Sequence, residues 1–172
     1  SHVLFTGEPG SGRETFVRYL KLLGHSPESP LVYVMGSELN EADAARVLFG
    51  GDGEKGVLER AESGMLFINE ISEMSAVGQQ LLLGALEKDS YRPDGAREDR
   101  VLDTRIIASA PAGFERSKDF NAELLHFLSG VIVRVPALRQ YSEDVPELLR
   151  YYVELLVDSE NLPFRRFTVA AQ

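Results

Sequence analysis

Residues 3–14 read Val-Leu-Phe-Thr-Gly-Glu-Pro-Gly-Ser-Gly-Arg-Glu, an apolar run that leads directly into a glycine-rich turn. The apolar run predicts a short buried strand over 3–6, and the spacing of apolar residues over 12–23 predicts a helix after the turn. Small residues in such a turn let successive backbone N–H groups surround a phosphate at the helix N-terminus. The pattern therefore predicts a phosphate-binding loop made of Gly7, Glu8, Pro9, Gly10, Ser11, Gly12, Arg13 and Glu14.

One position of this loop departs from the G-x-x-x-x-G-K pattern, because Arg13 stands where the pattern has lysine. The lysine ammonium of that pattern reaches between the β- and γ-phosphates of a nucleotide. Arginine keeps the positive charge, but its planar fork is longer and branched. The loop alone therefore does not decide whether the chain is an enzyme.

The composition indicates one ordinary globular core. The chain has 172 residues, of which 44% are hydrophobic, and it has no cysteine, which excludes disulfides and thiolate chemistry. No apolar run approaches the roughly 20 residues that span a bilayer. The net charge of −9 argues against a direct grip on nucleic acid, so DNA would be bound through a domain outside this chain. We expect a cytoplasmic protein without membrane contact, and no metal site, since the three histidines are scattered.

Further strands and helices alternate along the chain. Strands are predicted at 31–35, 65–68, 105–109 and 131–135, and helices at 41–49, 75–88, 120–128 and after Ser142, which is placed to cap the last helix. In helix 75–88 we expect a buried stripe of Val77, Leu81, Leu82, Ala85 and Leu86. Short, continuously apolar strands between helices imply a parallel sheet covered on both faces.

Four further segments carry a resemblance to a known family: Leu-Phe-Gly at 48–50, Gly-Val-Leu-Glu-Arg-Ala at 56–61, Gly-Met-Leu-Phe-Ile-Asn-Glu-Ile at 64–71 and Val-Pro-Ala-Leu-Arg-Gln-Tyr-Ser-Glu-Asp-Val at 135–145. In this order, and over nearly the whole chain, they resemble the central AAA+ domain of NtrC-type, sigma-54-dependent transcription activators. The resemblance implies an α/β, P-loop NTPase-like core over 1–140, with a five-stranded parallel sheet flanked by helices, and the start of a helical lid over 141–172. In that family a ring hydrolyses ATP and remodels sigma-54 RNA polymerase.

At the end of its third strand the family has Asp-Glu, where this chain has Asn69 and Glu70. In the family the Asp holds Mg²⁺ through water and the Glu polarises the attacking water. The neutral amide of Asn69 lacks the charge that attracts a hard dication, so Mg²⁺ is not expected to bind tightly. By the resemblance Asn69 still belongs to the nucleotide site, and Glu70 is a vestigial catalytic base or a structural residue at the strand end.

Other functional positions of the family are also replaced. Met35 stands at the Asn that restrains the glutamate, and Ala110-Pro111 at the sensor Thr-Asn. The two arginine fingers fall on Asn121 and Phe127, and such fingers contribute on the order of a thousand-fold or more to phosphoryl transfer. Only residues 51–55 separate Gly50 from Gly56, where the family has the Gly-Ala-Phe-Thr-Gly-Ala loop that touches sigma-54.

These departures predict a degenerate AAA+ module of a bacterial two-component, DNA-binding transcriptional regulator, similar to the NtrX-like branch without the sigma-54 loop. Its hydrolysis would be absent or negligible, and it would serve oligomerisation or signal relay through self-association. ATP or ADP would be held weakly by the backbone amides of 8–12. Contact with RNA polymerase stays open, and contact with sigma-54 is not expected.

The sequence leaves two alternatives open. The chain could be a working ATPase that remodels sigma-54 RNA polymerase and uses Arg13 in place of lysine. It could also bind another nucleotide, such as a cyclic dinucleotide, through the arginines Arg13, Arg92, Arg97 and Arg100. Against the second alternative, acidic residues are mixed with these arginines over 92–100, which is typical of a solvated hairpin.

Overall fold

The computed structural model describes residues 1–23 and 28–160. The chain divides into two units, residues 1–135 and 136–172, and each is described by itself. In the second unit a 3-10 helix, Leu138–Asp144, runs into α6, Val145–Glu160. His25 and residues 161–172 lie outside the described part of the chain.

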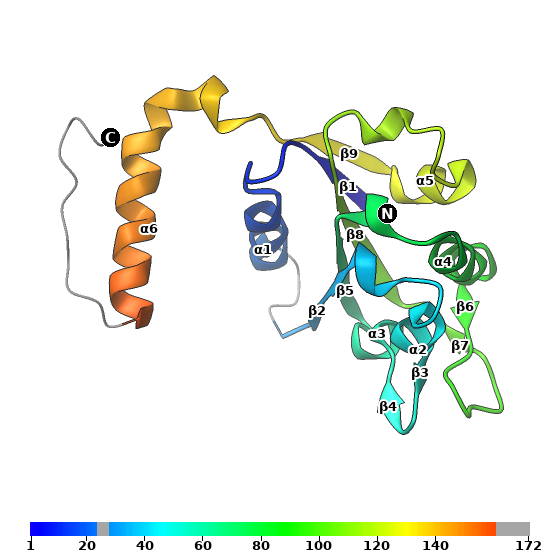
Figure 1. The fold of residues 1–172 in the computed structure, drawn as a ribbon. Helices are drawn as coiled ribbons and strands as arrows, with labels where there is room; N and C mark the ends of the chain where they lie inside the picture. The colour runs from blue at the N-terminus through cyan, green and yellow to red at the C-terminus, as the bar shows by residue number, and fades with distance from the viewer. Residues whose placement is uncertain (24–27, 161–172) are drawn as a thin grey trace. The chain divides into compact units, whose positions relative to one another are not determined.

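The first unit is built on a five-stranded sheet with the order β2-β5-β8-β1-β9 (Figure 1). All four neighbouring pairs are parallel. The strands are β1 (Val3–Thr6), β2 (Leu31–Met35), β5 (Gly64–Asn69), β8 (Thr104–Ala110) and β9 (Val131–Arg134). The predicted α/β class and the five-stranded parallel sheet are confirmed.

Helices cover both faces of this sheet (Figure 1). On one face lies α1 (Arg13–Leu23), and on the other lie α2 (Ala44–Phe49), α3 (Val57–Arg60), α4 (Ala76–Lys88) and α5 (Ala122–Leu128). Successive strand residues point to opposite faces, so Leu66 belongs to the larger core under α2–α5 and Phe67 to the smaller core that contains Val17 of α1. The strand ends are therefore held between two packed layers.

Short elements connect these layers. The 3-10 turns η1 (Gly36–Glu38) and η2 (Ile71–Glu73) follow β2 and β5, and η3 (Phe114–Arg116) follows β8. Two antiparallel hairpins are formed by β3 (Gly50–Gly51) with β4 (Glu54–Lys55), and by β6 (Ser90–Tyr91) with β7 (Arg100–Val101). The predicted hairpin around 92–100 is thus confirmed.

The buried face of α4 differs from the predicted stripe. Val77 is 38% exposed, whereas Gly78 and Gln79 are buried beside Leu82. A Cβ at Gly78 would lie 2.5 Å from the carbonyl oxygen of Leu39, so only glycine permits this approach. The apolar spacing therefore predicts most of the buried face of α4. In the first turn of the helix the buried face contains Gly78 instead of Val77, because Gly78 has no side chain and packs closely against Leu39.

Two predicted helix starts are corrected. The second helix begins at Ala44 rather than 41, because the Asn40 side-chain oxygen accepts hydrogen bonds from the backbone of Ala42 and Asp43 and holds a turn there. Ser142 does not cap the last helix, since it lies inside the 3-10 helix that precedes α6. Within residues 1–23 and 28–160, no helix has the length and apolar character needed to cross a membrane.

Candidate nucleotide site

The glycine-rich loop joins the end of β1 to the start of α1 (Figure 1). Gly10 and Gly12 have φ angles of 81° and 87°, a region that residues with a Cβ rarely adopt. The N–H of Gly7 donates to the carbonyl of Ala110 at 3.2 Å, which ties the loop to the end of β8. The loop therefore presents the N-terminus of α1 in the conformation that suits a bound anion.

Arg13, the first residue of α1, is turned toward the end of β5 and forms an ion pair with Glu70. Its side chain is 7% exposed and that of Glu70 is 20% exposed. Its Nη2 donates to Glu70 Oε1, while Nη1 is buried without a hydrogen-bond partner among the described residues. The positive charge that the loop pattern directs at phosphates is thus shared with the candidate base.

A second orphaned donor lies in the same loop. The Oγ of Ser11 is buried and has no hydrogen-bond partner in the described part of the chain. A buried polar group without a partner is costly, and a bound anion would satisfy it. The two unpartnered donors, Arg13 Nη1 and Ser11 Oγ, together with the start of α1, fit the phosphates of a nucleotide.

Glu70 has an unusual backbone, with φ 51° and ψ 60°. Left-handed conformations are costly for residues with a Cβ and persist where the surroundings impose them. Its N–H donates to Ser109 Oγ at 3.0 Å, and that hydroxyl donates to Asn69 Oδ1 at 2.6 Å. A Cβ at Gly36 would overlap the carbonyl oxygen of Glu70, so η1 packs directly against this backbone.

Asn69 is occupied on both sides of its amide. Its Oδ1 accepts from Ser109, and its Nδ2 donates to the Met35 sulfur at 3.5 Å, a weak acceptor. Met35 therefore contacts Asn69, and it is Ser109 that accepts the hydrogen bond from the backbone N–H of Glu70. The ends of β2, β5 and β8 are linked in this way to the ion pair at α1.

Sequence reasoning missed Ser109, although a signal existed. Ile68 of β5 is in register with Ala108 of β8, so Asn69, the last residue of β5, lies level with Ser109, the last but one of β8. Polar residues at the end of two neighbouring apolar strands indicate a shared site at that edge of the sheet.

The donor set does not fit a tightly bound Mg²⁺. Asn69 is neutral, and its oxygen is engaged by Ser109. Glu14 occupies the position at which the loop pattern has the hydroxyl that binds Mg²⁺, and its carboxylate pairs with Arg18 at 2.8 Å on the surface. Among the described residues, no group of three or more His, Cys, Asp or Glu side chains could hold a metal ion.

Asn121 and Phe127, which stand where the family has its arginine fingers, have structural roles. Asn121 is the N-cap of α5, and its Oδ1 accepts from the backbone of Glu123 at 3.0 Å and of Leu124 at 2.9 Å. Phe127 is partly buried and packs against the larger core. At the sensor position, Ala110 is fully buried.

The structure does not bring Arg13 together with the hairpin arginines. Arg92 pairs with Asp99 at 2.7 Å, and Arg100 pairs with Glu59 at 2.9 Å. Their hairpin extends from the end of α4, whereas α1 lies across the sheet (Figure 1). These contacts favour a solvated hairpin over a cyclic dinucleotide site.

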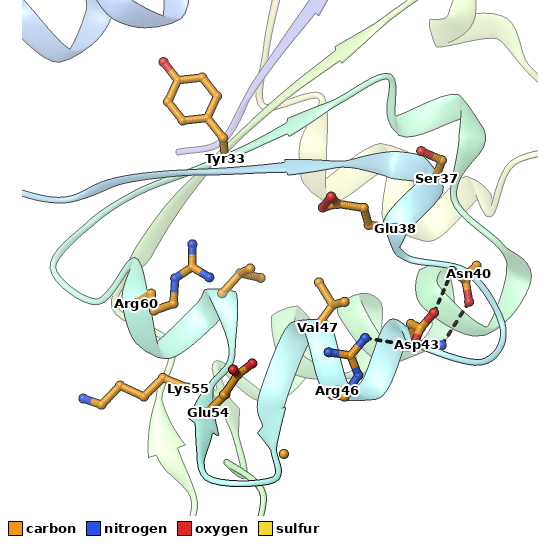
Figure 2. Close-up of a pocket in the computed structure, with 12 residues that line it drawn as sticks. Tyr33, Ser37, Glu38, Asn40, Asp43, Arg46, Val47, Glu54, Lys55 and Arg60 are labelled. Carbon is orange, nitrogen blue, oxygen red and sulfur yellow. Dashed lines mark hydrogen bonds and ion pairs between the residues drawn. The ribbon is translucent and has the colours of Figure 1, made fainter.

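A cleft of about 600 Å³ lies beside the edge strand β2, between α2, α3 and the β3–β4 hairpin. Figure 2 shows its charged lining, in which Asp43 lies between Asn40 and Arg46. Acidic and basic side chains are balanced in it, and no residue of the glycine-rich loop lines it. It is separate from the candidate nucleotide site.

A model of the Sigma-54 interaction domain family matches residues 1–134. The chain belongs to this family. Among relatives of this sigma-54 interaction domain, the Nitrogen assimilation regulatory protein NtrX of Azorhizobium caulinodans is 30% identical over 96% of this chain and 38% of its own length. The DNA-binding transcriptional regulator NtrC of Rhizobium meliloti is 31% identical over 96% of this chain and 36% of its own length.

Solved structures agree with this assignment. NtrX from Brucella abortus, in complex with ADP and in complex with ATP, is 28% identical to this chain, with a TM-score of 0.85 in both cases. The match covers 98% of this chain and 39% and 41% of the two NtrX chains. The chain thus spans about two fifths of the length of the relatives that it matches.

Proposed function

We propose that this chain is a degenerate AAA+ module of a bacterial two-component, DNA-binding transcriptional regulator, and that its ATP hydrolysis is absent or negligible. The ion pair between Arg13 and Glu70 carries this proposal. In an active enzyme of this class the loop cation stabilises the phosphates, while the glutamate acts separately on the attacking water. Here the two groups neutralise each other.

Two further observations support the same function. The Asn69 side chain is a neutral amide and brings no negative charge to a metal, and its oxygen is already bonded to Ser109. Asn121 caps α5 where an arginine finger would project. Loss of one such finger reduces phosphoryl transfer on the order of a thousand-fold or more.

The proposed module holds ADP or ATP weakly through the loop, self-associates, and relays a signal to a DNA-binding domain outside this chain. Residues 141–172 would begin its helical lid. The two-stranded hairpin over 50–55 replaces the longer loop of the active family, so sigma-54 contact is not part of the proposal. The NtrX structures with ADP and ATP support nucleotide binding by analogy.

A second candidate is an active ATPase that remodels sigma-54 RNA polymerase, which the match to the Sigma-54 interaction domain favours. The two candidates differ in one measurable property. An active ring assembles before it hydrolyses, so its specific rate of phosphate release rises steeply with protein concentration.

Phosphate release from ATP should therefore be measured over a wide range of protein concentration, with Mg²⁺ present. The matched control is Glu70→Ala, purified in the same way, which reports contaminating activity. We expect the same background rate from both proteins. A rate that rises with concentration and is lost in Glu70→Ala would support the second candidate and overturn the first.

A further inference from the structure

The glycine-rich loop presents donors for a diphosphate, but the neighbouring Glu70 opposes a third phosphate. We propose that this site selects ADP over ATP and does so without a divalent cation. This inference rests on the proposed function, because it requires Glu70 to be a partner of Arg13 rather than a working base. Its experiment is nevertheless independent of hydrolysis.

Two buried donors without hydrogen-bond partners in the part of the chain that the structure describes favour the binding of a diphosphate. Arg13 Nη1 and Ser11 Oγ are both buried without partners among the described residues. They accompany the N-terminus of α1, an eleven-residue helix preceded by two glycines with positive φ. Two phosphate groups bring enough acceptor oxygens to satisfy both donors, as well as the backbone amides at the start of α1.

Discrimination against a third phosphate comes from Glu70. In loops of this type the cation at the Arg13 position reaches between the β- and γ-phosphates. The Nη2 group of Arg13 is already bonded to Glu70 Oε1. A γ-phosphate would therefore approach a carboxylate of like charge. The resulting repulsion weakens the binding of ATP and leaves the binding of ADP unaffected.

Glu70 cannot move away as a unit. Its N–H is bonded to Ser109 Oγ, and its carbonyl oxygen packs against Gly36. The carboxylate can leave Arg13 only by rotation of its own side chain, which breaks the ion pair. ATP would thus have to displace Glu70, whereas ADP would not.

Within residues 1–23 and 28–160, no group of acidic side chains could hold a divalent cation that would screen this repulsion. In active relatives Mg²⁺ bridges the β- and γ-phosphates. Here Asn69 is neutral and its oxygen is bonded to Ser109, while Glu14 pairs with Arg18. The preference for ADP should therefore be the same with Mg²⁺ and with EDTA.

The test is calorimetric titration of the full chain with ADP and with the non-hydrolysable β,γ-methylene analogue of ATP, each in Mg²⁺ and in EDTA. We expect ADP to bind roughly tenfold more tightly or better, because one unscreened like-charge contact suffices for that ratio. Glu70→Gln removes the charge and should bring the two affinities within about threefold, mainly by strengthening the analogue. Arg13→Ala should weaken both ligands.

The control is Asp99→Asn, the same carboxylate-to-amide change in a surface ion pair with Arg92, which should leave the ratio unchanged. Thermal unfolding of each variant verifies folding. Equal or tighter binding of the ATP analogue, a Mg²⁺-dependent gain for it, or an unchanged ratio in Glu70→Gln would each overturn the proposal. Absence of ADP binding would also overturn this proposal but would not affect the proposed lack of hydrolysis. Conversely, ATP turnover together with a preference for ADP would overturn the proposed lack of hydrolysis and support the selection of ADP.

Discussion

The contact between Arg13 and Glu70 can be measured by a double-mutant cycle with Arg13→Met and Glu70→Gln. Each single change removes one charge and leaves its partner in place, and the double variant removes both. The non-additive part of the unfolding free energies isolates the interaction of the two side chains. This coupling free energy shows how strongly Arg13 is bound to Glu70.

The exposed fractions of the two side chains determine the coupling free energy that we expect. Breaking a fully buried ion pair costs about 3–5 kcal/mol, and an exposed pair contributes about 0–1 kcal/mol. Arg13 is 7% exposed and Glu70 is 20% exposed, so this pair lies between the two limits. The unpartnered Arg13 Nη1 lowers its net contribution. We expect each single variant to lose about 2 kcal/mol, with a coupling of about 1–2 kcal/mol.

Urea unfolding followed by circular dichroism gives these free energies, and thermal unfolding should show losses of about 4–8 °C for each single variant. The matched control is the same cycle on Arg92 and Asp99, which are 60% and 50% exposed and should couple by less than about 1 kcal/mol. If both cycles gave the same coupling, Arg13 would be free for phosphates and the proposed loss of hydrolysis would lose its main support.

Three further changes test other parts of the site and its frame. Gly36→Ala would place a Cβ into the Glu70 carbonyl and should cost about 1–3 kcal/mol of stability in the same urea assay. The control is Gly84→Ala inside α4, where a Cβ meets nothing within 4 Å and should add about 0.5–1 kcal/mol of stability. Equal effects of the two changes would contradict the close approach of Gly36 to Glu70. Burial is the largest cause that lowers the pKa of His2, and nearby positive charges, Arg105 among them, lower it further. The unfolded chain therefore binds the proton first, and stability should fall as pH decreases below 6.5, more weakly in His2→Asn; identical pH profiles would exclude this contribution. Asn121→Ala should cost about 1 kcal/mol by removing the α5 cap, whereas Asn121→Asp should keep most of that stability, because aspartate is also a good N-cap; equal losses in both variants would contradict a capping role.

Strong local patterns predicted most of the fold. Apolar runs bounded by glycine, proline or polar residues gave β1 and β2 at the expected residues, and the glycine turn placed α1 correctly. These features depend on neighbours in sequence. The errors arose where a contact between distant residues decided the outcome, as when Gly78 packed on Leu39 and left Val77 exposed.

The candidate site was predictable as a set of positions but not as a set of contacts. Family resemblance marked Arg13, Asn69 and Glu70 for separate roles toward a nucleotide. It could not indicate that Arg13 pairs with Glu70, because that contact joins residues 57 positions apart and depends on the reach of an arginine side chain. Ser109 was missed for the same reason, since its importance follows from strand register.

The residues that differ from the pattern of the active family also support the fold itself. Arg13 holds Glu70, Asn121 caps α5, and Asn69 is bonded to Ser109. Arg13→Lys would give a shorter cationic side chain and release Glu70. It would supply neither a carboxylate for Mg²⁺ at position 69 nor the trans-acting arginines. Because catalytic groups that act as a unit are strongly non-additive, each single reversion should lower stability without raising turnover. Under the proposed function, packing and hydrogen bonding would therefore maintain the loss of hydrolysis, in addition to the absence of the catalytic side chains.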